Sequence, residues 1–440
     1  MAAIALDILY ALGLVAASPV WLTRMIRHRR YRTGWAQRFG RAPVCGGGPP
    51  VIWIHAVSLG EVNGIRALVD ELDAQLPDHR IVISSTTDTG MARARALFVP
   101  RREVFQFPLD FSWAVRRAFR RVDPALVVLM EGEIWPNFLA VANRRGVPVV
   151  VVNGRMSENK GYPRYRKIRP LIRRLFNRLT VLAVQDEVYA ERFIDLGAEP
   201  GRVKVTGMMK FDTVDTSEHV AGAEDLAAAL GLGAGDRLIV AGGTGPGEEA
   251  MLLEQLDALR AGGRMGSRTF LAIVPRKPER FEEVARLIEK AGFEAVRRTA
   301  RPDGTGGTLE DGAVILGDTM GELRKFYSLA DAVFVGRSLV PMGGSDMLEA
   351  AALGKPVAFG PHVFNFPQAP DLLAAGGAVQ VADAEELART LEAWLADPQA
   401  AATLGRRAAA YIRSRQGATA RNVAIIGDLL GRSAGAAATP

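Results

Sequence analysis

The stretch Val51-Ile-Trp-Ile-His-Ala-Val-Ser-Leu-Gly-Glu61 decides the fold. It begins as a short apolar run rich in β-branched residues and ends in a glycine turn that leads into a helical pattern. The same order recurs, with predicted strands at Val51–His55, Arg80–Ser84, Ala125–Met130, Val147–Val152 and Val181–Val184 and predicted helices at Val62–Leu76, Thr89–Phe98, Ser112–Arg121 and Phe138–Arg145. Such alternation predicts βαβ units and a parallel sheet with helices on both faces.

A second series of strands and helices follows a polar, aperiodic stretch around residues 212–224 and restarts at Arg237–Ala241. The chain is therefore predicted to be an α/β protein of two doubly wound, Rossmann-like domains, with the carboxyl-end loops of both sheets around one cleft. The predicted parts are a membrane anchor at 1–22, a first domain at 23–212, a linker at 213–224, a second domain at 225–432 and a disordered tail at 433–440. Packing of the last helix back on the first domain is an open alternative.

Composition narrows the class of protein. A chain of 440 residues, with 48% hydrophobic and 23% charged residues, is long enough for two folded domains. Its single cysteine, Cys45, excludes an intramolecular disulfide and any metal site made of several cysteines. The net charge of +7 indicates an acidic partner, either nucleic acid, nucleotide or anionic lipid. The sequence contains no zinc-finger spacing and no RNP-like motif, so nucleic acid is disfavoured.

The first residues have the features of a membrane anchor. Residues 2–22 are apolar apart from Asp7, Ser18 and small neutral residues, which is long enough for a spanning helix of about 20 residues. Arginines follow this segment instead of preceding it, so we predict an anchor rather than a signal peptide, with the rest of the chain in the cytoplasm. Two alternatives are an interfacial helix, with Trp21 and Trp35 at headgroup level, and a helix that packs on the chain's own domain.

The loop after the first strand contains the first candidate residues. Ser58 and Glu61 have the spacing of a capping box, and Gly60 permits the turn between strand and helix. A carboxylate at this position can also take a proton from an acceptor hydroxyl, and the two interpretations are compatible.

Two further loops in the first half begin at the carboxyl ends of predicted strands. Glu131 and Glu133 flank a glycine and indicate either acid–base chemistry or the start of a helix with Pro136 in its first turn. Arg155 is either a ligand for phosphate or carboxylate or an ordinary surface arginine. A basic run at 160–178, which includes Lys160 and Arg164, is predicted either to contact acceptor phosphates or anionic lipid or to be a solvated helix face.

In the second half, glycine-rich loops indicate an anionic ligand. Residues 242–249 lack the lysine of a P-loop and the spacing of a dinucleotide-binding motif, yet allow a backbone approach to an anion. Pro275 and Arg276 close the next strand. In Gly343-Gly-Ser-Asp-Met-Leu-Glu349 two glycines precede a helix, and Glu349 is placed either to bind ribose hydroxyls or to lie on the helix surface. Together these features predict nucleotide binding.

Six blocks in series resemble those of 3-deoxy-D-manno-octulosonic acid (Kdo) transferases of lipopolysaccharide synthesis. They are Trp53-Ile-His-Ala-Val-Ser-Leu-Gly-Glu61, Glu133-Ile-Trp-Pro-Asn137, Asn153-Gly-Arg-Met-Ser157, Thr206-Gly-Met-Met-Lys-Phe-Asp212, Asp318-Thr-Met-Gly-Glu322 and Gly360-Pro-His-Val-Phe-Asn-Phe366. The resemblance implies a GT-B fold and a metal-independent, inverting transfer of Kdo from CMP-Kdo to a lipid A precursor. It also implies a location at the cytoplasmic side of the inner membrane, and no cofactor.

The resemblance also assigns roles to residues of this chain, with Glu61 as the catalytic base. It also implies that the nucleotide binds to the C-terminal domain. The predicted acceptor-binding residues are Ser58, Gly60, Glu133, Arg155, Lys160 and Arg164. The predicted donor-binding residues are Thr244, Pro275, Arg276, Gly317, Met320, Gly321, Gly344, Ser345, Asp346 and Glu349. Where the family usually reads Gly-Gly-His-Asn-Pro-Leu-Glu, this chain has Ser345-Asp-Met347, which puts an aspartate beside the expected phosphate site. The alternatives are a GT-B transferase for another nucleotide sugar, such as a UDP-sugar, and a lipid-binding protein with a decayed donor site.

Overall fold

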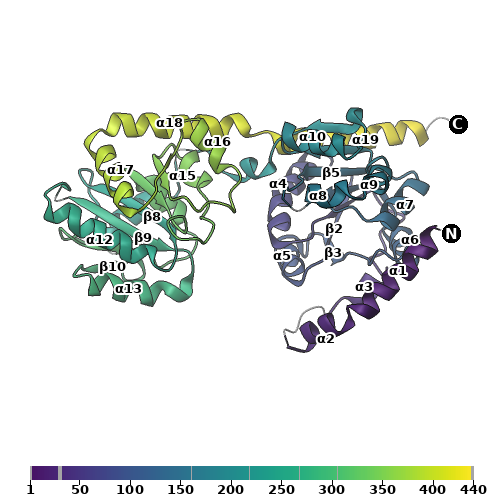
Figure 1. The fold of residues 1–440 in the computed structure, drawn as a ribbon, viewed down its shortest axis with the longest axis horizontal. Coiled ribbons are helices and arrows are strands. Elements are labelled where there is room, and N and C mark those ends of the chain that lie inside the picture. Colours follow the sequence, from purple (N-terminus) through teal and green to yellow (C-terminus); the bar gives the residue numbers. More distant parts are fainter. Residues whose placement is uncertain are drawn as a thin grey trace. The chain divides into compact units, whose positions relative to one another are not determined.

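The computed structural model describes residues 2–27, 32–159, 161–217, 219–266, 268–304 and 306–437. The chain forms two compact units, unit 1 from residues 1–213 and 416–440 and unit 2 from residues 214–415. Each unit is built on one seven-stranded sheet in which the paired strands are parallel, with helices on both faces (Figure 1). The predicted α/β class and the two doubly wound sheets are therefore confirmed.

The sheet of unit 1 has the order β3-β2-β1-β4-β5-β6-β7, in which the chain starts in the middle and winds first to one edge and then to the other. Its strands are β1 (Val51–His55), β2 (Arg80–Ser85), β3 (Glu103–Gln106), β4 (Pro124–Met130), β5 (Val149–Gly154), β6 (Val181–Val184) and β7 (Val203–Val205). The central strands are buried on both faces, as their continuous apolar runs require.

The helices of unit 1 divide between the two faces of this sheet. One core contains Ile52 and Ile54 and is covered by α4 (Leu59–Gln75), α5 (Asp88–Phe98) and α19 (Ala418–Ala437). The other core contains Trp53 and is covered by α6 (Ser112–Val122), α7 (Pro136–Arg144), α9 (Arg169–Phe176) and α10 (Glu187–Asp195). The short α3 (Trp35–Arg38) contacts β3, and α8 (Gly161–Arg166) precedes α9.

Unit 2 repeats the architecture with the order β10-β11-β9-β8-β12-β13-β14. Its strands are β8 (Arg237–Thr244), β9 (Thr269–Pro275), β10 (Ala295–Arg297), β11 (Val314–Leu316), β12 (Ala332–Val335), β13 (Val357–Phe359) and β14 (Val379–Gln380). Its helices are α11 (Ala223–Leu230), α12 (Glu248–Ala261), α13 (Phe281–Lys290), α14 (Leu323–Leu329), α15 (Leu348–Ala352), α16 (Ala369–Ala374), α17 (Ala384–Ala396) and α18 (Pro398–Arg415). A core that contains Ile239 and Phe334 lies under α12, α13 and α17.

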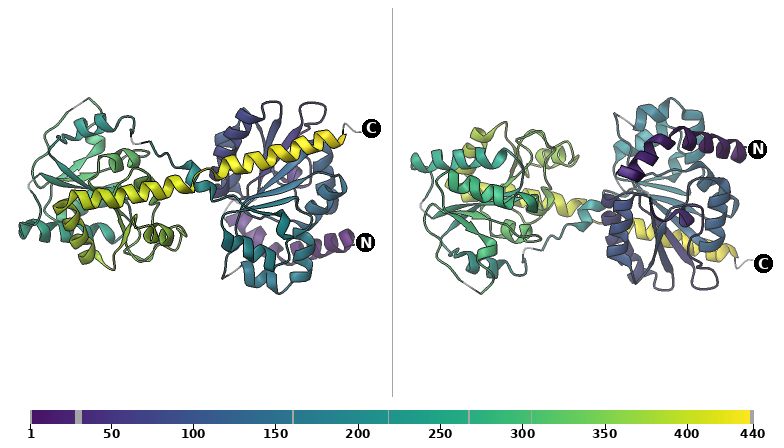
Figure 2. Two further views of the ribbon diagram at one scale, coloured as in Figure 1. Left: turned by 90° about the horizontal axis from the view of Figure 1, so that it is seen from above. Right: turned by 90° about the horizontal axis from the view of Figure 1, so that it is seen from below.

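The last helix, α19, belongs to unit 1 and lies against its sheet, as the open alternative proposed (Figure 2). Asp212 fixes the start of this helix, because its carboxylate accepts the backbone N–H groups of Gly417 and Thr419 at 2.6 and 2.5 Å. Unit 2 runs from Val214 to Arg415. The sequence analysis predicted a linker at 213–224 and a second domain at 225–432. The helix extends to Ala437, into the segment that was expected to be disordered.

The N-terminal segment consists of two helices, α1 (Ala2–Ala16) and α2 (Ser18–Arg27), instead of the single helix expected over residues 2–22. Pro19 explains the break, since it cannot donate a backbone hydrogen bond to the preceding turn. Within the described residues, no single helix has the length and apolar composition needed to cross a membrane. The two helices meet that test only together, as a pair bent by 54°.

Candidate active site

The loop between β1 and α4 holds Glu61 in a buried position, with 9% of the residue exposed. Its carboxylate accepts the backbone N–H of Val57 at 2.9 Å and that of Ser58 at 3.2 Å, and the Ser58 hydroxyl donates to it at 2.9 Å. Ser58 in turn accepts the N–H of Glu61, so the predicted capping box is present. The carboxylate is thus fixed in orientation at the carboxyl end of the sheet, at the positive end of α4.

His55, the last residue of β1, lies directly before this loop and is fully buried. Its Nδ1 lies 3.0 Å from the Ser84 carbonyl oxygen, and its ring stacks on Phe107 at 3.7 Å. Burial lowers the pKa of His55 to about 3, so the imidazole stays neutral at physiological pH. His55 is therefore a structural residue of this strand end.

The loop between β4 and α7 brings two more carboxylates to the same end of the sheet. Glu131 has a left-handed backbone with φ of 59°, uncommon for a residue with a side chain, and Gly132 follows at 111°. Burial, followed by the charge of Glu61, raises the pKa of Glu133. Burial also raises the pKa of Glu131; the Arg155 guanidinium opposes this effect and the charge of Glu61 adds to it. Glu61, Glu131 and Glu133 therefore form one electrostatically coupled cluster, called the carboxylate cluster below.

Arg155 is joined to the carboxylate cluster by an ion pair, because its Nε lies 2.7 Å from the Glu131 carboxylate. Slightly more than half of the Arg155 side chain, 55%, is exposed, which leaves surface for a ligand. Helix α8 is also close, since burial and then the charge of Glu133 raise the pKa of Tyr165, while Arg164 opposes them. Of the predicted acceptor residues, only Lys160 lies outside the described residues. Glu131 was named with Glu133 as a candidate for acid–base chemistry but was not among the predicted acceptor-binding residues, and the structure places it in the carboxylate cluster.

In unit 2, Glu248 organises the glycine-rich turn after β8. The side chain is fully buried and accepts the backbone N–H groups of Gly245, Arg337, Ser338 and Leu339, with distances of 3.0, 2.5, 2.8 and 3.0 Å. Burial raises the pKa of Glu248, whereas these hydrogen bonds favour its ionised form. The carboxylate therefore ties the turn after β8 to the loop after β12. The sequence assignment did not include it.

The neighbouring residues of the turn have structural partners as well. The Thr244 hydroxyl donates to Glu249 at 2.8 Å, and Glu249 in turn pairs with Arg280 at 2.5 Å. Pro275 ends β9, and the backbone N–H of Arg276 donates to the Thr244 carbonyl. The side chain of Arg276 is exposed. The structure thus presents Arg276, and not the Thr244 hydroxyl, to an incoming ligand.

The loop after β11 contributes three of the predicted donor residues. The backbone N–H of Gly317 donates to the Ile273 carbonyl at 2.9 Å, which holds this loop beside the end of β9. Met320 is 67% exposed, and Gly321 has a φ of 87°, as a glycine permits. These residues line the same carboxyl edge of the sheet as the turn after β8, because β11 pairs with β9 in parallel and β9 with β8.

The Gly343–Glu349 segment differs from the sequence expectation in where its helix begins. Helix α15 starts at Leu348, so Gly344 is separated from it by Ser345, Asp346 and Met347. The Ser345 hydroxyl donates to the Gly243 carbonyl at 2.7 Å, which joins this segment to the turn after β8. Asp346 accepts the N–H of Leu348 at 3.1 Å, so its carboxylate stabilises the start of the helix. The departure from the family pattern therefore has a local structural role.

Glu349 and Asp346 also lie near the buried Tyr327, whose pKa is raised by burial first and then by these two carboxylates. Arg337 was not among the predicted donor residues, yet it has a left-handed backbone with φ of 59° in the loop that Glu248 holds. Its Nη2 donates to the Met342 carbonyl at 3.3 Å. Among the residues that the structure describes, no group of three or more His, Cys, Asp or Glu side chains is placed to hold a metal ion.

Each of the two Rossmann-like units carries its candidate loops at the carboxyl ends of parallel strands, which is where open α/β sheets bind ligands. A solved glycosyltransferase from Rickettsia africae has this fold, with a TM-score of 0.55 at 12% identity over 87% of this chain and 99% of that one. Residues 33–213 match the family model of 3-deoxy-D-manno-octulosonic-acid transferase.

Curated relatives identify the family. The 3-deoxy-D-manno-octulosonic acid transferase of Bordetella pertussis is 36% identical over 96% of this chain and 99% of its own length. That of Haemophilus influenzae is 33% identical over 93% of this chain and 94% of its own length. This chain belongs to the 3-deoxy-D-manno-octulosonic acid transferase family.

Proposed function

We propose that the protein transfers Kdo from CMP-Kdo to a lipid A precursor, with inversion at the anomeric carbon and without a metal ion. The observation that carries this proposal is Glu61, a carboxylate held by two backbone N–H groups and a hydroxyl beside two further carboxylates. A fixed carboxylate at the carboxyl end of a sheet is suited to take a proton from an alcohol. Membership of the Kdo transferase family supports the choice of sugar.

In the proposed reaction the Glu61 carboxylate takes the proton of an acceptor hydroxyl, and the hydroxyl oxygen attacks the anomeric carbon of Kdo. The bond between that carbon and the CMP oxygen breaks, and CMP leaves with the electron pair. Since the phosphate of CMP is a good leaving group, the donor side needs stabilisation of negative charge more than a strong acid. Glu131 and Glu133, which lie beside Glu61, are placed to hydrogen-bond further hydroxyls of the acceptor and so to orient it.

Unit 2 is the proposed donor-binding unit. Its turn after β8 and its loops after β11 and β12 lie at one edge of the sheet, and Arg276 and Arg337 supply positive charge to that edge. Such groups stabilise a phosphate without a bound metal. The Asp346 carboxylate accepts the backbone N–H of Leu348, so part of its hydrogen-bonding capacity is used within the protein.

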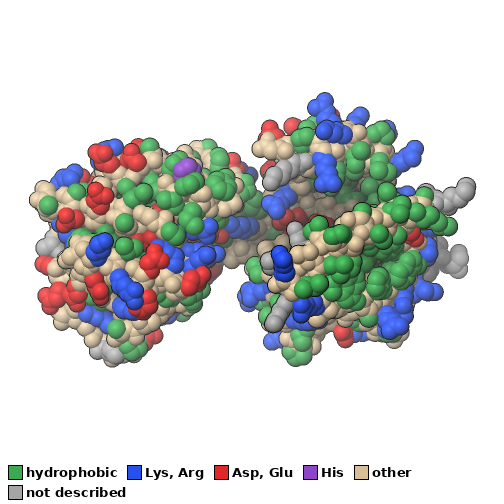
Figure 3. Space-filling view, turned by 60° about the horizontal axis from the view of Figure 1, so that its bottom comes forward, with side chains coloured by type: hydrophobic (Ala, Val, Ile, Leu, Met, Phe, Trp, Pro, Cys, Tyr) green, Lys and Arg blue, Asp and Glu red, His purple; other side chains and the backbone are tan. Residues whose placement is uncertain are grey.

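We further propose that α1 and α2 lie in the cytoplasmic surface of the inner membrane. One face of α1 is exposed and apolar, with Ile4, Ile8, Leu9, Leu12 and Val15 each at least 56% exposed. Figure 3 shows a band of hydrophobic side chains on this face of unit 1, bordered by Lys and Arg. An apolar helix face beside basic residues is suited to the headgroup region, where the acceptor lipid would also be located.

The proposal is tested by the release of CMP from CMP-Kdo in the presence and absence of a lipid A precursor. We expect release to depend on the acceptor, and we expect CMP to raise the melting temperature more than UDP or other nucleotides do. If a UDP-sugar supports transfer while CMP-Kdo does not, the donor assignment is wrong. If no nucleotide binds, the enzymatic assignment fails as a whole.

A further inference from the structure

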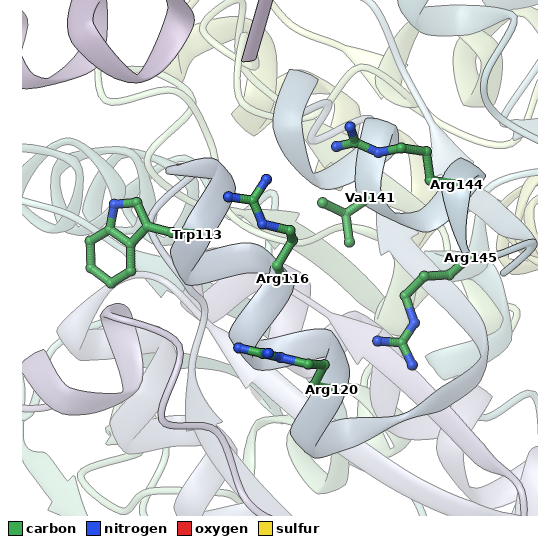
Figure 4. Close-up of a pocket in the computed structure, with 6 residues that line it drawn as sticks. All are labelled: Trp113, Arg116, Arg120, Val141, Arg144 and Arg145. Carbon is green, nitrogen blue, oxygen red and sulfur yellow. The ribbon is translucent and has the colours of Figure 1, made fainter. Parts of the chain in front are cut away.

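A pocket of about 580 Å³ lies between α6 and α7 in unit 1 (Figure 4). Its lining consists of Trp113, Arg116, Arg120, Val141, Arg144 and Arg145. These residues belong to neither the carboxylate cluster nor the loops described above. Four of its six lining residues are arginines, which come from α6 and from the end of α7, and none of its lining residues is a carboxylate.

Part of this positive charge has a local explanation. Arg120 and Arg144 lie in the last turns of their helices, where a cation favours the helix dipole, and Arg145 pairs with Asp123 at 2.9 Å. Arg116 has no such explanation. It lies four residues before Arg120 on the same helix face, and among the described residues neither of the two forms an ion pair. Two like charges at this spacing destabilise a helix by a few tenths of a kcal/mol, so an external anion is the natural partner.

Aromatic rings connect this pocket to the N-terminal helices. Trp113 stacks on Phe39 at 5.6 Å and on Phe111 at 6.0 Å, and Phe111 contacts Tyr10 of α1 at 6.2 Å. The row continues from Phe39 through Trp35 to Trp21 of α2. Rows of Trp and Tyr are typical of the level at which lipid headgroups meet the hydrocarbon region. The pocket therefore adjoins a row of side chains that are suited to the headgroup region.

Helix α1 is also tied to the two helices that form the pocket. Asp7 accepts hydrogen bonds from the backbone N–H and hydroxyl of Ser112, the first residue of α6, at 2.8 and 2.6 Å. It accepts a third at 3.0 Å from the side chain of Asn137, in the first turn of α7. Asp7, which interrupts the apolar run, thus attaches α1 to the first turns of α6 and α7. The exposed face of α1, the aromatic row and the pocket belong to one continuous surface.

We propose that the pocket between α6 and α7 binds the phosphate of an anionic phospholipid headgroup and thereby fixes unit 1 on the membrane. This inference rests on the membrane attachment proposed above and adds the chemistry of the lipid. Arginine suits the role because its guanidinium donates paired hydrogen bonds to a phosphate. The exposed apolar side chains of α1 and α2 would bind any bilayer, whereas the pocket would select anionic ones.

The test is flotation of the full chain with vesicles of phosphatidylcholine alone and of phosphatidylcholine mixed with phosphatidylglycerol. The variant is Arg116→Gln/Arg120→Gln, and the charge-matched control is Arg66→Gln/Arg95→Gln, two exposed arginines of α4 and α5 in the same unit. We expect the first variant to lose on the order of thirtyfold in binding to the anionic vesicles, about fivefold for each arginine. We expect the control to lose little, and both to bind phosphatidylcholine vesicles as the wild type does.

Each other outcome overturns a distinct part of the inference. Equal losses in the variant and the control would replace the pocket with a diffuse charge effect. Saturable binding of inorganic phosphate by the wild type without vesicles, lost in the variant, would make the ligand a soluble phosphate. A raised KM for detergent-dispersed lipid A precursor in the variant would assign the pocket to the acceptor. If the wild type binds no vesicles of either composition, the membrane attachment itself fails.

Discussion

Glu61 is both a helix-capping residue and the proposed base, and two substitutions separate these roles. Glutamine keeps one acceptor oxygen and is accepted at this position of a capping box, so Glu61→Gln retains most of the turn while it removes the base. Alanine removes both acceptors and leaves the N–H groups of Val57 and Ser58 without this partner. The two variants should therefore have similar activity and different stability.

The magnitudes follow from these contacts. Loss of a general base lowers kcat by roughly 10²- to 10⁴-fold, and we expect this in both variants. The glutamine variant forfeits one carboxylate hydrogen bond to a backbone N–H, about 1 kcal/mol, and the alanine variant about 2–3 kcal/mol. For a unit of this size 1 kcal/mol corresponds to about 2–4 °C in melting temperature.

The assay is the initial rate of CMP release together with thermal unfolding of the same samples. Glu187→Gln serves as the matched control, because Glu187 is an exposed carboxylate in the first turn of α10 in the same unit. This control should keep wild-type activity and stability. A folded Glu61→Gln protein with more than about a tenth of the wild-type kcat would refute the role of Glu61 as base.

Three further predictions follow from the same contacts. Burial raises the pKa of Asp110 from 3.8 to about 6, so the folded chain binds this proton more tightly than the unfolded chain does. The stability that Asp110 contributes is therefore present below pH 4, and it decreases by about 3 kcal/mol as the pH rises through 6. Urea unfolding should show this dependence on pH in the wild type and not in Asp110→Asn. Glu248→Gln leaves an amide with one acceptor oxygen facing four N–H groups. It should lower the free energy of unfolding in urea by about 3 kcal/mol and weaken CMP binding. Glu254→Gln, at an exposed site on the same helix, should change neither quantity. Asp346→Asn keeps an oxygen for the Leu348 N–H, so calorimetry should find a CMP affinity within about threefold of wild type, and a larger gain would mean that the aspartate charge repels the phosphate.

The central strands could be predicted from the sequence because their signal is local. The apolar run of β1 and the Ser58–Glu61 spacing after it identify a strand, a turn and a capped helix without any tertiary information. The strands β3, β7, β10 and β14 have no such run and were not predicted; each is short and is the outermost strand at one edge of its sheet. Their pairing depends on neighbours that are distant in the chain.

Other features depend on contacts that no local pattern contains. The return of α19 to unit 1 is set by Asp212, which bonds to N–H groups more than 200 residues away. Likewise, the coupling among Glu61, Glu131 and Glu133 follows from the adjacency of β1 and β4 in the sheet. The sequence pointed to Glu61, Glu131 and Glu133 as carboxylates that follow predicted strands, whereas the roles of Glu248 and Arg337 emerge from hydrogen bonds and backbone conformation in the structure.

The most direct test of the proposed reaction is the mass of the lipid product. A lipid A precursor incubated with the protein and CMP-Kdo, without added metal and with a chelator present, is measured by mass spectrometry. The account predicts that the precursor gains the mass of one Kdo residue or a whole multiple of it, and that Glu61→Gln protein leaves it unchanged. An unmodified lipid with the wild-type protein, or full modification with the variant, would contradict the account.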